Sequence, residues 1–263
     1  MTMLGYFRRL RQYQDLLATF TLKDIQVRYK QTFLGAAWAI TQPLAFMVIL
    51  TALKSVIFGE SDSEGAPHQI FFYCAMVPWV FFQNGLSFSV ASIAGNMNLV
   101  KKIYFPREIF PVSAILASVV DFLISSAIFI VMMLYFRIPC TWSLLWVPAL
   151  FGIEVVFVMA LGMFVSASNV FYRDVKYIVP LLVQLLFFVS PVMYSVDRVP
   201  EAYRAWYLLN PMAVIIDGFR RAVIHGTGPD PVYLALSGLV SVLCWLLAYR
   251  YFKHCEARFA DLI

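Results

Sequence analysis

Three ionisable side chains lie inside long apolar stretches of this chain: Lys54, Asp121 and Glu154. Each costs about 2.5–3.5 kcal/mol at the centre of an isolated inserted helix, so each is expected to face other helices or water. Lys54 lies near the end of its stretch and can extend its ammonium group toward the interface. Asp121 and Glu154 could form a proton or ion path, or they could be paired with polar neighbours inside a helix bundle.

Motifs for common catalytic and nucleotide-binding sites are absent from the sequence. It has no Gly-x-x-x-x-Gly-Lys-Ser/Thr loop, no Gly-x-Gly-x-x-Gly and no Gly-x-Ser-x-Gly. The three histidines are far apart, and no two of the four cysteines have the Cys-x-x-Cys spacing of a zinc site. We therefore expect no catalytic residue, no metal and no cofactor in this chain. A membrane-bound glycan enzyme remains the enzymatic alternative.

The composition is that of an integral membrane protein. Of the 263 residues, 62% are hydrophobic and 13% are charged, whereas a soluble domain is typically about 45–50% apolar and about 25% charged. The formal net charge is +5, but the basic residues lie beside apolar stretches. This arrangement indicates charges that set membrane topology rather than a nucleic-acid surface.

The hydropathy pattern predicts an all-α protein with six transmembrane helices, because a span needs about 20 mostly apolar residues. Residues 1–32 are expected to form a cytoplasmic interface segment, and residues 33–263 the six-helix transmembrane domain. The expected spans are about 33–58, 70–95, 109–136, 142–166, 178–196 and 232–252. Contacts between them would rest on scattered small residues and aromatics, since the chain has no Gly-x-x-x-Gly pair.

The distribution of positive charge predicts the orientation of these spans. Of the 20 Lys and Arg residues, six fall on one side and the remaining 14 on the side of both termini. Those six are Lys54, Arg137, Arg198, Arg204, Arg220 and Arg221. Because cytoplasmic loops carry the excess of Lys and Arg, we expect both termini to be cytoplasmic.

Two regions depart from the simple pattern of spans. Residues 4–30 repeat apolar side chains every three or four positions, which is typical of an amphipathic helix in the cytoplasmic interface, with Arg and Lys toward the headgroups. Residues 200–226 form the only long segment on the predicted outer side, and within it Pro211 to Ile224 is apolar at its start but too short to span. The Asn210-Pro211 break favours two short re-entrant helices in the outer leaflet, and a surface loop is the alternative.

Two predicted cytoplasmic loops mix cations with aromatic residues. They are 96–108, which contains a short helical stretch ended by Pro106, and 168–176. Both are either stop-transfer charge or protein-docking surfaces, since Tyr, Phe and Arg are frequent anchors of protein interfaces.

These features together resemble the permease subunit of ABC-2 type polysaccharide exporters, which move O-antigen, capsule polysaccharide or teichoic acid. The matching segments are Arg28-Tyr29-Lys30, Leu34-Gly35, Trp38, Pro43, residues 102–107, Phe171-Tyr172-Arg173-Asp174, Ser190-Pro191 and Asn210-Pro211. Their order and spacing cover essentially the whole chain.

The resemblance implies a homodimer in the bacterial inner membrane that works with two copies of a separate ABC ATPase, which would hold ATP and Mg²⁺. The 98–108 loop would be the main coupling helix and the 168–176 loop a second contact. The coupling residues would be Lys101, Lys102, Tyr104, Phe105, Pro106, Arg107, Tyr172, Arg173 and Asp174.

The implied substrate is a polysaccharide on an undecaprenyl diphosphate carrier, most simply O-antigen. Arg28, Tyr29 and Lys30 lie where its diphosphate would bind, and Arg suits phosphate. Trp38, Phe188 and Tyr194 are the candidates for lining a channel at the dimer interface. The alternatives are an ABC-2 permease for capsule, teichoic acid, a small lipid or a drug, and an ion-coupled secondary transporter.

Overall fold

The computed structural model describes residues 12–30, 35–58, 67–102 and 105–259, and every regular element in these ranges is helical. The all-α expectation is therefore confirmed for this part of the chain. The helices are α2 (Gln14–Tyr29), α3 (Trp38–Phe58), α4 (His68–Ser92), α5 (Met97–Lys102), α6 (Ile109–Tyr135), α7 (Trp146–Phe171), α8 (Val175–Val189), α9 (Glu201–Tyr207), α10 (Pro211–Val223) and α11 (Pro231–Glu256). Short 3-10 turns span Gly35–Ala37, Ala94–Asn96, Trp142–Leu145 and Val196–Arg198.

Within the described ranges, five helices are long and apolar enough to cross a membrane. They are Trp38–Val56, His68–Ser92, Ile109–Tyr135, Trp142–Phe171 and Pro231–Glu256, which correspond to five of the six expected spans.

The helix at the remaining expected span, 178–196, which is the fifth along the chain, has different bounds. α8 has 15 residues and ends at Val189, so residues 190–196 are not part of it. Ser190 is extended (ψ 153°) because the ring of the following Pro191 disfavours helical backbone at the preceding residue.

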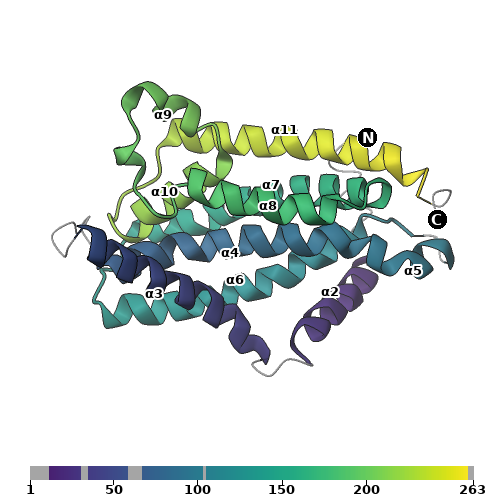
Figure 1. Cartoon of the computed structure of the whole chain (residues 1–263), viewed down its shortest axis with the longest axis horizontal. Coiled ribbons are helices and arrows are strands. Elements are labelled where there is room, and N and C mark those ends of the chain that lie inside the picture. The colour runs from purple at the N-terminus through teal and green to yellow at the C-terminus, as the bar shows by residue number, and fades with distance from the viewer. Residues whose placement is uncertain (1–11, 31–34, 59–66, 103–104, 260–263) are drawn as a thin grey trace.

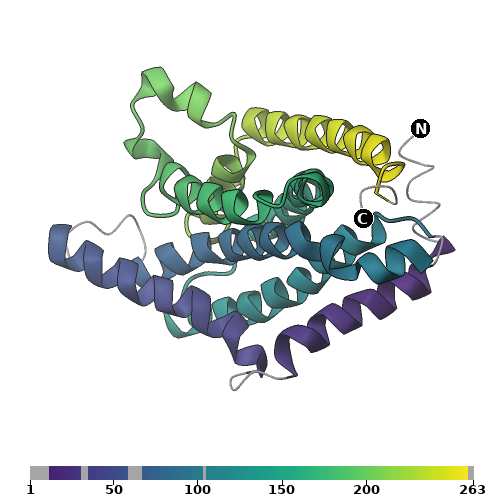
Figure 2. The same cartoon turned by 45° about the vertical axis from the view of Figure 1, so that its right-hand side comes forward.

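α4 is the central helix of the bundle, with other helices on several sides (Figures 1 and 2). In its most apolar window 83% of the residues are buried, compared with 28–39% in the other four long helices. α5 and the C-terminal end of α11 lie at one end of the bundle, which we call the α5 end. α9 and α10 lie at the opposite end, the α9 end (Figure 1).

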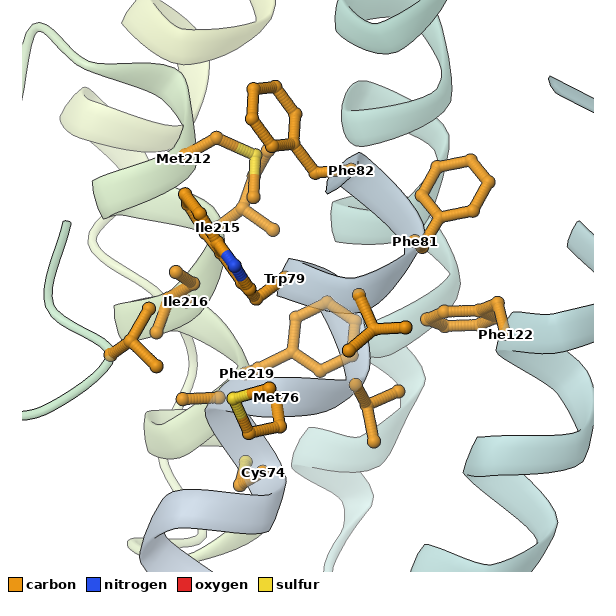
Figure 3. Close-up of a cluster of buried hydrophobic side chains, with 14 of the residues drawn as sticks. Cys74, Met76, Trp79, Phe81, Phe82, Phe122, Met212, Ile215, Ile216 and Phe219 are labelled. Carbon is orange, nitrogen blue, oxygen red and sulfur yellow. The ribbon is translucent and has the colours of Figure 1, made fainter. Parts of the chain in front are cut away.

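The interior around α4 is rich in aromatic and sulfur-containing side chains. Figure 3 shows Trp79 and Phe82 of α4 beside Met212 and Ile215 of α10. The Trp79 and Phe82 ring centres are 5.4 Å apart. α10 is therefore part of the hydrophobic core, and a surface loop is excluded for residues 211–223.

Asn210 and Pro211 separate the two short helices expected between residues 200 and 226. The Asn210 Oδ1 atom accepts a hydrogen bond from the Met212 backbone N–H at 3.1 Å, and Pro211 occupies the first turn of α10. Asn is a favoured N-cap residue, and Pro in the first turn removes no helical hydrogen bond.

α2 runs beside α6 rather than lying apart from the bundle. The Phe20 and Phe110 ring centres are 5.2 Å apart, and the Ser113 hydroxyl donates to Asp24 Oδ2 at 2.8 Å. Further along the same face, Arg28 reaches α6. The expected helix is thus observed over Gln14–Tyr29, while residues 1–11 and 31–34 lie outside the described residues.

The orientation expected for the Arg and Lys residues of α2 is wrong for Arg28. Its side chain is turned inward to α6, whereas the apolar Leu22 and Val27 are exposed. The reason is Asp121: a carboxylate buried in an apolar bundle needs a counter-charge, and Arg28 supplies it.

Small residues allow close crossing of the central helices, as the sequence predicts. A Cβ atom at Gly85 of α4 would lie 2.7 Å from Val158 of α7, and one at Gly218 of α10 would lie 2.7 Å from Leu150 of α7. Both distances are shorter than a carbon–carbon contact allows, so a larger residue at either crossing would force the facing side chain to shift.

Candidate functional site

Arg28, near the C-terminal end of α2, is held by side chains and backbone of α6. Its Nη1 donates to Asp121 Oδ2 at 3.1 Å and to Ser118 Oγ at 3.2 Å, and its Nη2 donates to the Ala114 carbonyl at 2.9 Å. The guanidinium carbon lies 3.6 Å from the centre of the Phe88 ring of α4, within the range of a cation–π contact. Arg28 therefore ties α2 to both α4 and α6.

Asp121 accepts a second hydrogen bond, from the Tyr29 hydroxyl. The Arg28 and Asp121 side chains are 11% and 5% exposed, so their ion pair is largely buried. Burial lowers the pKa of the Arg28 guanidinium, and the Asp121 carboxylate opposes that shift. Burial also raises the pKa of the Tyr29 hydroxyl, with a further contribution from its hydrogen bond to Asp121, so Tyr29 remains a donor.

The pairing with Arg28 decides between the two interpretations offered for Asp121. It is paired with polar neighbours inside the bundle. The sequence did not reveal this partner, because the two residues are 93 positions apart.

The ion pair forms part of the wall of a cavity of about 320 Å³. Three of the predicted site residues, Arg28, Tyr29 and Trp38, meet there. The remaining lining residues are Ala39, Gln42, Asn84, Phe88 and Asp121. The cavity thus combines the Arg28–Asp121 ion pair with hydroxyl and amide groups and aromatic rings. The Arg28 guanidinium is the one of these groups that suits an anionic group of a larger ligand.

Lys30 does not line this cavity. It is exposed at the C-cap of α2, with its backbone N–H bonded to the Gln26 carbonyl at 2.8 Å.

Arg107 and Glu108, which lie between α5 and α6, are bonded to the C-terminal end of α11. Lys253 Nζ lies 2.5 Å from Glu108 Oε2 and 2.7 Å from Glu256 Oε2. Arg107 Nη1 donates to the Glu256 carbonyl at 2.7 Å. A cavity of about 590 Å³ opens here, lined by Gln12, Tyr13, Phe105, Pro106, Arg107, Lys253, Glu256 and Ala257.

Phe105 is 7% exposed, and its ring centre lies 5.4 Å from that of Phe110 and 6.1 Å from that of Phe20. Its side chain therefore supports the loop from within the permease. Tyr104 lies outside the described residues, as do the side chains of Lys101 and Lys102 at the end of α5.

The connection between α7 and α8 is open to its surroundings. Tyr172, Arg173 and Asp174 are all exposed, and the Tyr172 side chain is 69% exposed. These residues are accessible in the way that a docking contact requires.

A third cavity, of about 340 Å³, lies between α3, α4 and α8. It is lined by Phe46, Trp79, Gln83, Ser87, Pro180, Val183, Gln184, Phe187 and Phe188. The predicted channel residues Trp38 and Phe188 thus line two different cavities, and both are exposed.

Tyr194, the third predicted channel residue, closes the turn after α8. Its hydroxyl donates to the Val189 carbonyl at 3.0 Å and accepts from the Tyr207 hydroxyl at 3.1 Å.

The burial of Arg220 was not predictable from the sequence. The charge distribution indicates only that Arg220 is one of the six basic residues on the side away from the termini. Arg220 of α10 is 3% exposed and donates to the carbonyls of Pro191, Val192 and Tyr194 at 2.5, 2.7 and 2.8 Å. Its guanidinium carbon lies 3.7 Å from the centre of the Phe71 ring.

Lys54 also differs from expectation. It is 7% exposed, with Nζ 5.0 Å from the Phe71 ring centre, so it lies against an aromatic ring instead of extending outward.

Glu154, the second buried acid, has no paired neighbour of the kind that Asp121 has. It is fully buried in α7, and neither carboxyl oxygen has a hydrogen-bond partner among the described residues.

Comparison with known proteins gives matches along most of the chain. The family model described as "ABC-2 type transporter" matches residues 15–224. An O-antigen export system permease protein RfbA from Myxococcus xanthus is 28% identical over 264 residues, covering 99% of this chain and 100% of its own length. One from Klebsiella pneumoniae is 26% identical over 250 residues, covering 95% of each chain.

A relative with another printed substrate is the polysialic acid transport protein KpsM from Escherichia coli. It is 26% identical over 246 residues, covering 87% of this chain and 90% of its own length. These relatives are named as permeases or transport proteins rather than enzymes.

The family match extends from α2 to the end of α10, and so includes both Arg28 and the buried helix α10. With five helices long and apolar enough to cross a membrane among the described residues, the chain is a multi-pass inner-membrane permease. It belongs to the ABC-2 type transporter family.

Proposed function

We propose that this chain is the transmembrane subunit of an ATP-driven ABC transporter that exports an undecaprenyl-diphosphate-linked polysaccharide, O-antigen in the first instance. The observation that carries the proposal is the convergence of Arg28, Tyr29 and Trp38 on one cavity. Two relatives named as O-antigen export permeases, matched along nearly their whole length, support it.

Arg28, Tyr29 and Lys30 form the proposed recognition site for the lipid diphosphate. Arg28 offers a planar set of N–H donors that matches phosphate oxygens, and Tyr29 offers a hydroxyl donor beside it. Lys30 is exposed one position beyond α2, where a mobile ammonium group can attract an anionic headgroup.

The proposed topology has six crossings with both termini cytoplasmic. α8 would make the fifth crossing along the chain, although its 15 residues extend only about 22 Å and the hydrocarbon core is about 30 Å thick. The turn after α8, which Arg220 and Tyr194 hold, would complete that crossing. α9 and α10 would then be re-entrant outer gate helices, with the α5 end in the cytosol.

The proposed ATPase-docking surface lies at the α5 end. It comprises α5 with Lys101 and Lys102, the exposed Tyr172, Arg173 and Asp174, and Tyr104, which is outside the described residues. Phe105 and Arg107 support this surface from within, because Phe105 packs against α2 and α6 and Arg107 bonds to α11. Pro106 lines the cavity beside them. Two ATPase copies would hold ATP and Mg²⁺ and move these segments.

The export channel is proposed to form between two copies of this chain. The cavity at Phe188 combines aromatic rings with the Gln83 and Gln184 amides. Rings can stack on sugar faces and amides can hydrogen-bond sugar hydroxyls. Trp38 would line the approach from the Arg28 cavity, and Tyr194 would support the far end of the channel through its turn.

A capsule polysaccharide is the second candidate substrate, since two relatives are named for polysialic acid transport. A teichoic acid, a small lipid or a drug fits the same family without a specific observation in its favour. Family membership argues against an ion-coupled secondary transporter, and the pairing of Asp121 with Arg28 removes one member of its proposed ion path.

The test is export by the purified permease–ATPase complex in vesicles, with a polyprenyl-diphosphate glycan as substrate. We expect R28A to lower export at least about tenfold, because about 1.4 kcal/mol of lost phosphate binding corresponds to that factor. The control is R8A, which removes a positive charge of the same terminal segment. Equal losses in the two variants would mean that Arg28 is a topology charge only.

A further inference from the structure

We propose that Asp121 is a built-in counter-ion that occupies the place of the substrate's phosphate on Arg28 and sets which anionic lipids the site accepts. This inference rests on the proposed function, since it takes Arg28 as the group that binds the lipid diphosphate. The proposed recognition motif begins on α2, with Arg28 and Tyr29. Asp121 would be a specificity-determining residue on a different helix, α6.

The contacts of Arg28 single out Asp121 from its other partners. Ser118 and the Ala114 carbonyl are neutral acceptors and Phe88 is an aromatic ring, so none of them opposes an arriving anion. Asp121 alone among these partners carries a negative charge, and its Oδ2 lies 3.1 Å from Arg28 Nη1. Both side chains face the cavity of about 320 Å³.

An anion that enters this cavity meets Arg28 and Asp121 together. Like charges in a poorly solvated site repel each other strongly, so the anion must displace the carboxylate from the guanidinium. The neutral partners can stay in place during this exchange and keep Arg28 oriented. Tyr29, which donates to Asp121 from the same wall, is positioned to donate to the new anion.

The exchange discriminates between lipids by charge. A phospholipid with one negative charge only replaces the single charge of Asp121 on Arg28. Its phosphate therefore gains little net attraction, although it must lose its bound water to enter. A diphosphate brings two adjacent negative charges and more acceptor oxygens for Arg28, Tyr29 and the exposed Lys30. Asp121 thereby acts against the wrong ligand, as specific sites commonly do.

The membrane makes such discrimination necessary. Anionic phospholipids are abundant around any inner-membrane protein, and an unguarded arginine in a lipid-accessible cavity would attract them. A carboxylate already bound to that arginine keeps the site closed to single charges without blocking access to the cavity.

The test measures lipid binding to the purified full-length permease in nanodiscs of zwitterionic lipid. The two probes are undecaprenyl diphosphate and phosphatidylglycerol, and native mass spectrometry gives the affinity for each. In the wild type we expect the diphosphate to bind at least about tenfold more tightly. D121N, which keeps the side-chain shape and an acceptor oxygen, removes the charge that an arriving anion must displace, so it should raise the affinity for phosphatidylglycerol about tenfold.

R28Q separates failure of this inference from failure of the proposed function. If R28Q leaves diphosphate binding unchanged, Arg28 is not the phosphate site and the proposed function loses its central residue. If R28Q abolishes diphosphate binding but D121N leaves the affinity for phosphatidylglycerol at its wild-type value, the role of Asp121 is overturned while the recognition site stands.

D121S keeps the inference testable if D121N does not fold. It removes the same charge with a smaller side chain and leaves Arg28 its neutral partners, Ser118 and the Ala114 carbonyl. We expect phosphatidylglycerol affinity to rise about tenfold, as in D121N. An unchanged phosphatidylglycerol affinity in D121S would then overturn the proposal.

Discussion

Arg28 and Arg220 are two buried arginines that have nearly the same aromatic contact but different polar partners. Each guanidinium carbon lies over a phenylalanine ring, at 3.6 Å from the Phe88 centre and 3.7 Å from the Phe71 centre. Arg28 pairs with a carboxylate beside a cavity. Arg220 donates instead to three backbone carbonyls in the turn after α8.

The difference lies in what can replace the partner. A backbone carbonyl cannot leave without unfolding its turn, so the contacts of Arg220 belong to the fold. A carboxylate on a side chain can rotate away, and a cavity gives a ligand room to take its place. Burial of a charge therefore does not by itself identify a functional site; the nature of its partner and the space beside it do.

The largest effect should come from Arg220. R220A leaves the carbonyls of Pro191, Val192 and Tyr194 without this donor in a buried turn, at a cost of roughly 3 kcal/mol or more. We expect the amount of folded permease extracted from membranes to fall severely, measured as the monodisperse fraction in detergent.

The neighbouring arginine supplies the matched control for that variant. Arg221 is 37% exposed and pairs with Asp217 at 2.6 Å within the same helix, an interaction worth about 0.2–1 kcal/mol. R221A should therefore behave like the wild type. If R220A were as well folded as R221A, the claim that the contacts of Arg220 stabilise the fold would be wrong.

Sequence reasoning found Arg28 but not Arg220, and the reason is physical. Arg28 lies in a local pattern, Arg28-Tyr29-Lys30 before an apolar stretch, which can be recognised from neighbouring residues alone. The role of Arg220 depends on carbonyls 26–29 positions earlier in the chain, and any residue supplies a carbonyl. No residue type therefore marks that contact in the sequence.

The spans were predictable because hydropathy is a local property, and five of them appear as long apolar helices among the described residues. The inward face of α2 was not predictable, since it depends on Asp121 lying beside Arg28 across 93 residues. The same limit applies to Phe105, which has the residue type of a docking anchor but is buried against Phe20 and Phe110.

A smaller effect is expected at Lys253, which is another partly buried cation. Its partners are the side chains of Glu108 and Glu256, just as Arg28 pairs with the side chain of Asp121. E108Q removes the charge from a buried carboxylate that lies 2.5 Å from Lys253 Nζ and leaves the Glu256 contact in place. We expect a loss of about 1–2 kcal/mol, the difference between a charged and a neutral hydrogen bond.

Because Glu108 follows the proposed docking segment, E108Q should also weaken capture of the ATPase subunit during co-purification. The control is E201Q, at an exposed position in the first turn of α9. Reduced thermal stability with full ATPase capture would mean that this ion pair belongs to the fold alone, as the contacts of Arg220 do.

Glu154 provides the last effect, which has the opposite sign. Its carboxyl group is buried without a hydrogen-bond partner among the described residues, so it has neither the backbone contacts of Arg220 nor the ion pair of Asp121. Burying such a polar group costs about 1–3 kcal/mol. E154M, with a side chain of similar length, should therefore raise the thermal unfolding midpoint and leave export unchanged.

E154M also tests whether an acid without a partner can be functional here. A secondary transporter that moves ions along Glu154 would lose transport in E154M and in the nearly isosteric E154Q. An ABC-2 permease driven by a separate ATPase has no such need. If both variants fold well but export fails, Glu154 contacts a partner in another conformation. A buried acid without a partner would then identify a functional residue, as the cavity beside Arg28 does.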